Sequence, residues 1–297
     1  MVTLKELFDH QQDKSKNDII NREREKLFIE NINKKDMSCP IINTVITVLK
    51  NDYMYDFNNC IGKGGMTDSY DFIFNCTHNN INVNLNIELK VLNSYKLPQL
   101  ADIYIKNNNI IQNQYKSFCH NWLTKYLPHI KKKFDIQSDL PTYNDIQINI
   151  CKPGKSPCEF LQELKENIKT NKENNLYLKE LSKRFIDRFI KKNYNKINRE
   201  VIVDLYKSKL NCKDFIIIYN KKQEQIKIIN NKSKIINIEL TNITKKYCMN
   251  NKYIVGLNLL FRVTKTNIIE EKTAHLRLVW KNNNGVYGPA WKLSPLE

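Results

Sequence analysis

The spacing of apolar residues changes several times along the chain, and each change predicts a new element. Residues 17 to 33 place apolar side chains about one or two helical turns apart with charges between them, which predicts an amphipathic helix. Residues 41 to 49 follow Pro40 and leave helix and strand both open, although the proline favours a helix. Around the turn sequence THNN, the run YDFIFNC and the alternating run INVNLNIELKVL predict the two strands of a β-hairpin.

The rest of the chain divides into helical and strand-rich parts. Residues 98 to 127 are predicted to be helical, beginning at Pro98 and ending before Pro128. Residues 129 to 157 contain several prolines and no clear period, so we expect a connector with room for one short strand at 146 to 150. Residues 159 to 208 predict a long helical region, and the final third carries apolar segments between polar turns, which predicts mostly antiparallel sheet.

Together these elements predict an α/β (α+β) protein with a mixed central sheet flanked by helices and a helical plus antiparallel-β C-terminal region. A chain of 297 residues is long enough for one large domain or for two smaller ones. Because the connector lacks periodic elements, we expect a first domain over residues 1–150 and a second over residues 151–297.

Charge and cysteine content narrow the classes of partner. The chain has 48 Lys and Arg against 31 Asp and Glu, and its net charge of +17 favours a polyanionic partner, nucleic acid first. The alternative explanation of this charge is AT-rich codon usage, which raises the lysine count without any function. Eight cysteines without a CxxC pair exclude zinc-ribbon and zinc-finger patterns. The charged N-terminus and the lack of any apolar run near ~18 residues predict a soluble, intracellular protein with no membrane partner.

The residues with the clearest chemistry follow a glycine-rich loop at 62 to 65. Asp71 opens the first strand of the hairpin, and Glu88-Leu89-Lys90 lies in the second. Positions two apart on a strand share a face, so Glu88 and Lys90 are expected to project together beside Asp71. Two carboxylates suit Mg²⁺, and a neighbouring lysine can orient or deprotonate a water molecule or stabilise charge on phosphorus. The alternative is an ordinary hairpin whose Glu and Lys form a surface charge pair.

This arrangement resembles the PD-(D/E)XK nuclease superfamily over roughly residues 17 to 127. The resemblance implies a restriction-endonuclease-like fold and metal-dependent phosphodiester cleavage, with Mg²⁺ or Mn²⁺ bound by Asp71 and Glu88 and with Lys90 in the catalytic lysine position. Asp68, three residues earlier in the loop, is the alternative first ligand. Relatives in which the first helix adds a ligand make Glu30, and after it Glu23, further candidates. The proline of the family motif is missing here.

Two segments are candidates for contact with DNA. Lys63 lies in the glycine-rich loop, where backbone N–H groups can cradle a phosphate. The segment from 275 to 292 predicts a hairpin in which cations alternate with aromatic residues, a pattern suited to DNA backbones and bases. Its candidate residues are Arg277, Lys281, Tyr287 and Lys292. The alternative is that Tyr287 and the tryptophans of this segment close a β core.

The sequence therefore predicts a metal-dependent endonuclease that acts on double-stranded DNA. A sequence-specific type II restriction enzyme is the first subtype, and double-strand cleavage then needs two active sites, most simply in a homodimer. Two alternatives remain open. One is a structure-specific or recombination-associated nuclease, and the other is a non-catalytic DNA-binding protein with a nuclease-like fold.

Overall fold

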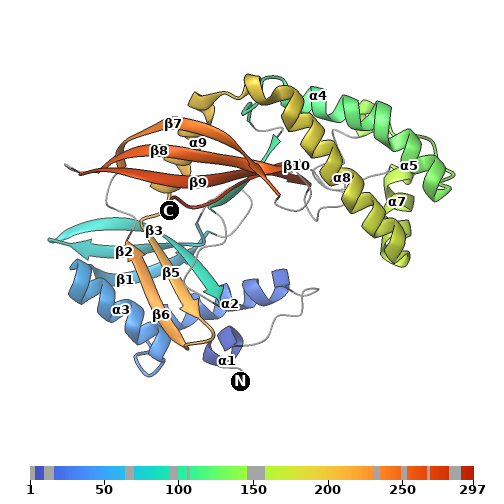
Figure 1. The fold of residues 1–297 in the computed structure, drawn as a ribbon. Coiled ribbons are helices and arrows are strands. Elements are labelled where there is room, and N and C mark those ends of the chain that lie inside the picture. Colours follow the sequence, from blue (N-terminus) through green and yellow to red (C-terminus); the bar gives the residue numbers. More distant parts are fainter. Residues whose placement is uncertain are drawn as a thin grey trace. The chain divides into compact units, whose positions relative to one another are not determined.

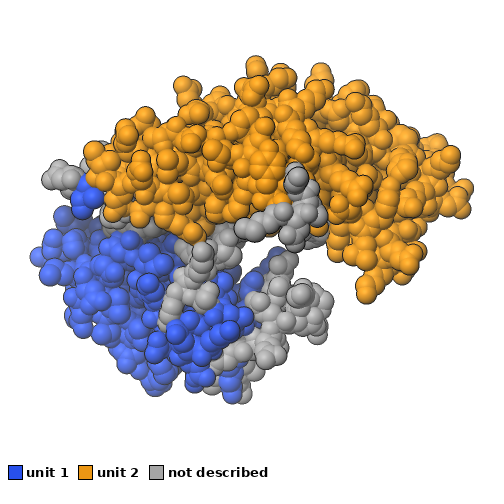
Figure 2. All heavy atoms as spheres, in the orientation of Figure 1, with its two compact units in different colours: residues 1–97, 207–236, 265–268 blue, residues 98–206, 237–264, 269–297 orange. Residues whose placement is uncertain are grey.

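The chain folds into two compact units, each built from segments that are distant in the sequence (Figure 1, Figure 2). The structure is a computed structural model that describes residues 4–9, 17–63, 70–93, 100–105, 108–145, 158–230, 235–248, 253–265, 268–280 and 289–297. Unit 1 comprises residues 1–97, 207–236 and 265–268, and unit 2 comprises residues 98–206, 237–264 and 269–297.

In its described residues, unit 1 contains a mixed five-stranded sheet, preceded in the chain by three helices. The strand order is β1-β2-β3-β5-β6, in which β3 and β5 are parallel and all other neighbours are antiparallel. The helices are α1 (Leu4–Asp9), α2 (Asn17–Asn33) and α3 (Pro40–Tyr53), and the strands are β1 (Asp56–Gly62), β2 (Phe72–His78), β3 (Ile81–Leu92), β5 (Phe215–Asn220) and β6 (Gln225–Asn230).

The core of unit 1 is aromatic where α2 meets the sheet. Phe28 is fully buried, and its ring stacks on those of Phe72 and Phe74 with centroids 5.2 and 6.3 Å apart. The α3 helix starts with Pro40 in its first turn and ends at Tyr53, and the next residue, Met54, has a left-handed backbone conformation. The alternating residues Leu85, Ile87 and Leu89 of β3 face this core, as their spacing predicts.

Parallel pairing of β3 and β5 requires a long crossover, because parallel neighbours cannot be joined by a tight turn. Residues 98–206 of unit 2 lie within that connection, and α9 (Arg199–Asn211) directly precedes β5. Asp214 fixes where β5 begins. Its backbone N–H donates to the Asn86 carbonyl, and its carboxylate accepts the Asn86 N–H, both at 2.8 Å.

Unit 2 combines a helical region with a second sheet. The sheet order is β4-β10-β9-β8-β7, and β10 is antiparallel to both of its neighbours. The helices are α4 (Gln114–Asn121), the π-helix η2 (Trp122–Tyr126), α5 (Leu127–Phe134), α7 (Glu159–Thr170), α8 (Lys172–Asn193) and the 3-10 helix η4 (Tyr194–Lys196). The strands are β4 (Ala101–Tyr104), β7 (Ile235–Tyr247), β8 (Ile254–Lys265), β9 (Ile268–Trp280) and β10 (Pro289–Leu293). In the described part of the chain, no helix is both long and apolar enough to span a bilayer.

Most of the predicted elements are confirmed, including the mixed α/β composition. The helices at 17–33 and after Pro40, the hairpin of β2 and β3, the helices within 159–208 and the C-terminal strands are all present. One prediction is wrong. Residues 101–104 form β4 by pairing with β10, and the helix begins only at Gln114 and continues past Pro128 to Phe134. Pairing with a distant strand outweighs the local pattern at β4, and Pro128 lies in the first turn of α5, directly after the π-helix η2.

The two units also divide the chain differently from the expected boundary at residue 150. Residues 98–150 belong to unit 2, and residues 207–236 belong to unit 1 because β5 and β6 complete its sheet. The short strand expected at 146–150 lies outside the described residues.

Replacing Phe28 by alanine should test the aromatic core of unit 1. We expect the free energy of unfolding to fall by about 3–5 kcal/mol, because a fully buried ring and its two stacking contacts are removed. Denaturant unfolding monitored by circular dichroism measures this change. Ile81→Ala, at a side chain that is 65% exposed in the same unit, should change stability by less than about 0.5 kcal/mol. Equal effects of both substitutions would contradict this description of the core.

Candidate active site on strands β2 and β3

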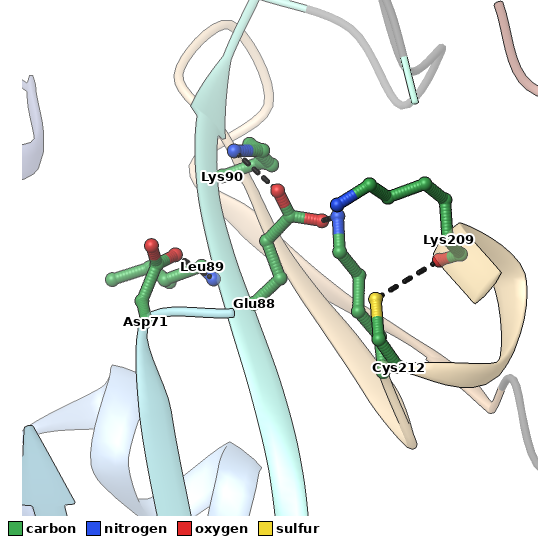
Figure 3. Close-up of polar contacts among 7 residues, drawn as sticks. Asp71, Glu88, Leu89, Lys90, Lys209 and Cys212 are labelled. Carbon is green, nitrogen blue, oxygen red and sulfur yellow. Dashed lines mark hydrogen bonds and ion pairs between the residues drawn. The ribbon is translucent and has the colours of Figure 1, made fainter. Parts of the chain in front are cut away.

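Three hydrogen bonds fix Asp71, two of them to the backbone of β3 and one to Lys63. Its N–H donates to the Ile87 carbonyl at 2.9 Å, and its own carbonyl accepts the Lys63 N–H at 2.9 Å. One carboxylate oxygen, Oδ2, accepts the Leu89 N–H at 2.8 Å, and this bond is drawn in Figure 3. The side chain is therefore fixed against the β3 backbone through one oxygen.

Glu88 and Lys90 project from β3 together, as their spacing predicts. Lys90 Nζ lies 2.6 Å from Glu88 Oε1, and Figure 3 shows both side chains beside the strand. Glu88 is only 9% exposed, whereas about a third of the Lys90 side chain is exposed. A carboxylate this far removed from water needs a positive partner, and Lys90 is one.

The second partner of Glu88 is Lys213, which the sequence analysis did not identify. Its ammonium group donates to Glu88 Oε2, and the residue is 4% exposed. Lys213 lies two residues before β5, and β5 pairs with β3 so that Glu88 is opposite Ile216. Figure 3 also shows the Lys209 side chain, from the end of α9, extending towards the same carboxylate. Glu88 and Lys213 are 125 positions apart in the sequence, and the signal for their proximity is the pairing of β3 with β5.

Glu25 is the other residue that the sequence analysis missed. It lies on α2 and is half-buried. Burial raises the pKa of Glu25, and the negative charge of Asp71 raises it further, whereas the positive charges of Lys90 and Arg22 lower it. The predicted helix ligands Glu23 and Glu30 are exposed instead, and Glu30 pairs with Lys26 at 4.0 Å. At 3.6 residues per turn, Glu25 flanks the buried stripe of Arg24 and Phe28, whereas Glu23 and Glu30 lie on the far side of the helix. Helical phase could have selected Glu25.

Close packing of α2 on β1 brings Glu25 into this region. The amide side chain of Asn33 donates to the Cys60 carbonyl at 2.9 Å and accepts the Cys60 N–H at 2.6 Å. At Gly62, a β-carbon would lie 2.8 Å from Ile29 Cδ1, so a larger residue there would require the end of the Ile29 side chain to move. The first glycine of the loop therefore lies directly against a side chain of α2.

The charges of this cluster act strongly on one another. Burial raises the pKa of Asp71 despite the opposing effects of Lys90 and the Leu89 hydrogen bond, and the negative charge of Glu88 raises it further. For Lys90, burial alone would lower the pKa, but the charges of Glu88, Asp71 and Glu25 and the hydrogen bond to Glu88 raise it overall. Lys90 is therefore a firmly protonated cation in this state, suited to holding negative charge rather than to accepting a proton.

The residues fit a divalent cation by donor type. Glu25, Asp71 and Glu88 supply carboxylate oxygens, which Mg²⁺ prefers, and the lysines beside Glu88 offset part of their negative charge. Their present arrangement is not a metal centre. Both Glu88 oxygens are paired with lysines, and no group of three or more His, Cys, Asp or Glu in the described segments is arranged to hold a metal ion.

Comparison with known proteins identifies no relative. No protein-family model, no curated protein and no solved structure matches the chain.

The predicted DNA-contact residues fall in both units. Lys63 is exposed at the end of β1 in unit 1. In unit 2, Arg277 is exposed on β9 and lies opposite the half-buried Lys292 of β10. Trp280 and Trp291 are buried, which agrees with the alternative that the tryptophans close a β core. Lys281, Tyr287 and the alternative ligand Asp68 lie outside the described residues.

The raised pKa of Asp71 gives a pH-dependent prediction. The pKa of Asp71 is raised in the folded protein. A protein with such a carboxyl group becomes less stable as the pH rises from the pKa of the unfolded state through the pKa of the folded state. Asp71→Asn, which keeps an oxygen for the Leu89 N–H, should therefore stabilise the metal-free protein by about 1 kcal/mol or less at pH 8. Towards pH 4, near the ordinary value for aspartate, the gain should disappear.

Thermal unfolding of wild type and variant over this pH range, in the presence of a chelator, measures the effect. The matched control is Asp52→Asn, which changes an exposed carboxylate on α3 in the same unit. A variant that is less stable than wild type at pH 8 would contradict the raised pKa of Asp71.

Proposed function

We propose that this protein is a Mg²⁺-dependent DNA endonuclease of the PD-(D/E)XK type. The observation that carries the proposal is the convergence of Asp71, Glu88 and Lys90 from two paired strands with Glu25 from the preceding helix. An inert surface hairpin would not require a nearly buried glutamate or a carboxylate with a raised pKa. Such groups are more typical of functional sites.

The order of elements around the site supports the same proposal. The resemblance implies a helix, then a hairpin bearing Asp and Glu-x-Lys, within a mixed sheet flanked by helices. In unit 1, α2 precedes the hairpin of β2 and β3, and the sheet is mixed. The expected following helix at 98–127 belongs to unit 2, and the helix that leads into the parallel strand β5 is α9.

Each residue has a defined task in the proposed reaction. Asp71 and Glu88, with Glu25 as a third carboxylate, would hold the metal ion. When bound, Mg²⁺ would neutralise charge on the phosphate and lower the pKa of a water molecule. Lys90, protonated and partly exposed, would orient the attacking water or stabilise negative charge on the phosphate oxygens. The net charge of +17 would favour binding of the polyanionic substrate.

The subtype that we propose first is a sequence-specific type II restriction enzyme acting on double-stranded DNA as a homodimer. Cleavage of both strands requires two active sites, which a symmetric dimer supplies. A structure-specific or recombination-associated nuclease would use the same residues on branched or ended DNA.

One observation favours a second candidate, a non-catalytic DNA-binding protein with a nuclease-like fold. Both oxygens of Glu88 are neutralised by lysines, so the carboxylate is already satisfied without a metal ion. A protein that lost metal binding could keep its fold through these ion pairs. Metal-dependent cleavage separates the two candidates.

Incubation of supercoiled plasmid with purified protein and Mg²⁺ tests the proposed activity. We expect conversion to nicked and linear forms, no reaction with a chelator, and at least about a hundredfold lower rates for Glu88→Gln, Lys90→Met and Asp71→Asn. Glu25→Gln should also lower the rate, whereas the matched helix variants Glu23→Gln and Glu30→Gln should cleave like wild type. Undiminished cleavage by Glu88→Gln would refute the site, and DNA binding without any nicking would favour the non-catalytic candidate.

Binding to DNA gives a separate prediction for unit 2. Replacing Arg277 and Lys281 by alanine should weaken DNA binding and reduce the slope of log affinity against log salt by about two, because each phosphate contact contributes about 0.9. Fluorescence anisotropy with a labelled duplex at several salt concentrations measures the slope. Arg262→Ala, at an exposed arginine that lies 3.6 Å from Glu239 in the same sheet, is the control. An unchanged slope in the double variant would remove these residues from the DNA interface.

A further inference from the structure

Lys213 differs from Lys90 in one respect that matters for metal binding. Both ammonium groups pair with Glu88, but the Lys90 side chain is 33% exposed and the Lys213 side chain only 3%. Lys90 can exchange its carboxylate partner for water at a lower cost than Lys213 can. The cost is higher for Lys213, because an ammonium group that loses its partner inside a protein keeps the full penalty of burial.

The position of Lys213 is also fixed by the backbone around it. The next residue, Asp214, forms two hydrogen bonds with the backbone of Asn86, and β5 then runs parallel to β3. Because Asn86 is two residues before Glu88 on β3, the start of β5 is anchored beside the glutamate. The backbone of Lys213 therefore stays beside Glu88 as long as the two strands are paired.

We propose that Lys213 is a built-in counter-ion that replaces a divalent cation at Glu88 in the metal-free protein and sets how tightly the metal ion is bound. This inference rests on the proposed metal-dependent function. Removing the Lys213 charge leaves one positive charge fewer beside the three carboxylates, with Lys90 still paired with Glu88. Lys213 thus stabilises the empty site and opposes the metal ion, which must bind next to a permanent positive charge.

The variant Lys213→Met removes the charge and keeps most of the side-chain volume. Two opposite changes are expected. The melting temperature in the presence of a chelator should fall by roughly 5 °C or more, because Glu88 loses its buried partner. The affinity for Mn²⁺, measured by titration calorimetry, should rise about tenfold or more, because the ion no longer meets a fixed positive charge. Damage to the fold alone would lower both quantities.

Three further variants make the result specific. Lys213→Arg keeps the charge and should bind Mn²⁺ within about threefold of wild type. Lys213→Gln keeps a hydrogen-bond donor without the charge and should shift both quantities in the same directions as methionine, which also covers the case in which Lys213→Met does not fold. Lys222→Met, at an exposed lysine in the turn after β5, should change neither quantity.

The outcomes separate this inference from the proposed function. Unchanged or weaker Mn²⁺ binding by both Lys213→Met and Lys213→Gln would overturn the counter-ion role. A wild-type protein that binds no Mn²⁺ and cleaves no DNA would refute the proposed function, and the counter-ion role would then stand only if the uncharged variants gain Mn²⁺ binding. Tighter binding together with a less stable metal-free protein supports it.

Discussion

Neutralisation of one nearly buried carboxylate, that of Glu88, governs the architecture of unit 1. Both of its oxygens meet lysines, one from its own strand and one from the segment that leads into β5. A buried charge without such partners would be strongly destabilising, so the ion pairs and the strand pairing depend on each other. Asp71 and Glu25 belong to the same electrostatic cluster, since the charge of Asp71 acts on Glu25 and that of Glu88 acts on Asp71. These three carboxylates are the physical basis for the proposed cation site.

Local sequence patterns were sufficient to predict many of the helices and strands of unit 1. Period-two alternation located β3 and correctly paired Glu88 with Lys90, and the apolar spacing located α2. The pattern failed where an element depends on a distant partner. The strand β4 exists because β10 lies beside it, and the parallel partner of β3 comes from the segment that starts at Phe215. The boundary expected at residue 150 differed from the compact units for the same reason.

The two site residues that the sequence did not predict differ in how far they were predictable. Glu25 could have been chosen over Glu23 and Glu30 from helical phase, since it flanks the stripe that packs on the sheet. Lys213 could not, because it is one of 48 basic residues and nothing near it in the sequence distinguishes it. Its role follows only from the burial of its side chain and from the register of β5 against β3. Long-range pairing is thus the information that single-sequence patterns lack.

The separation of β3 from β5 also sets the order in which the molecule can form during its synthesis. More than a hundred residues lie between Leu92 and Phe215, and most of them belong to unit 2. At about 5–20 residues per second, a ribosome needs several seconds or more to translate that segment. Until then the nascent hairpin holds Glu88 without its buried counter-charge, and β3 remains an open edge. The cluster that we associate with chemistry is therefore among the last parts of unit 1 to be completed.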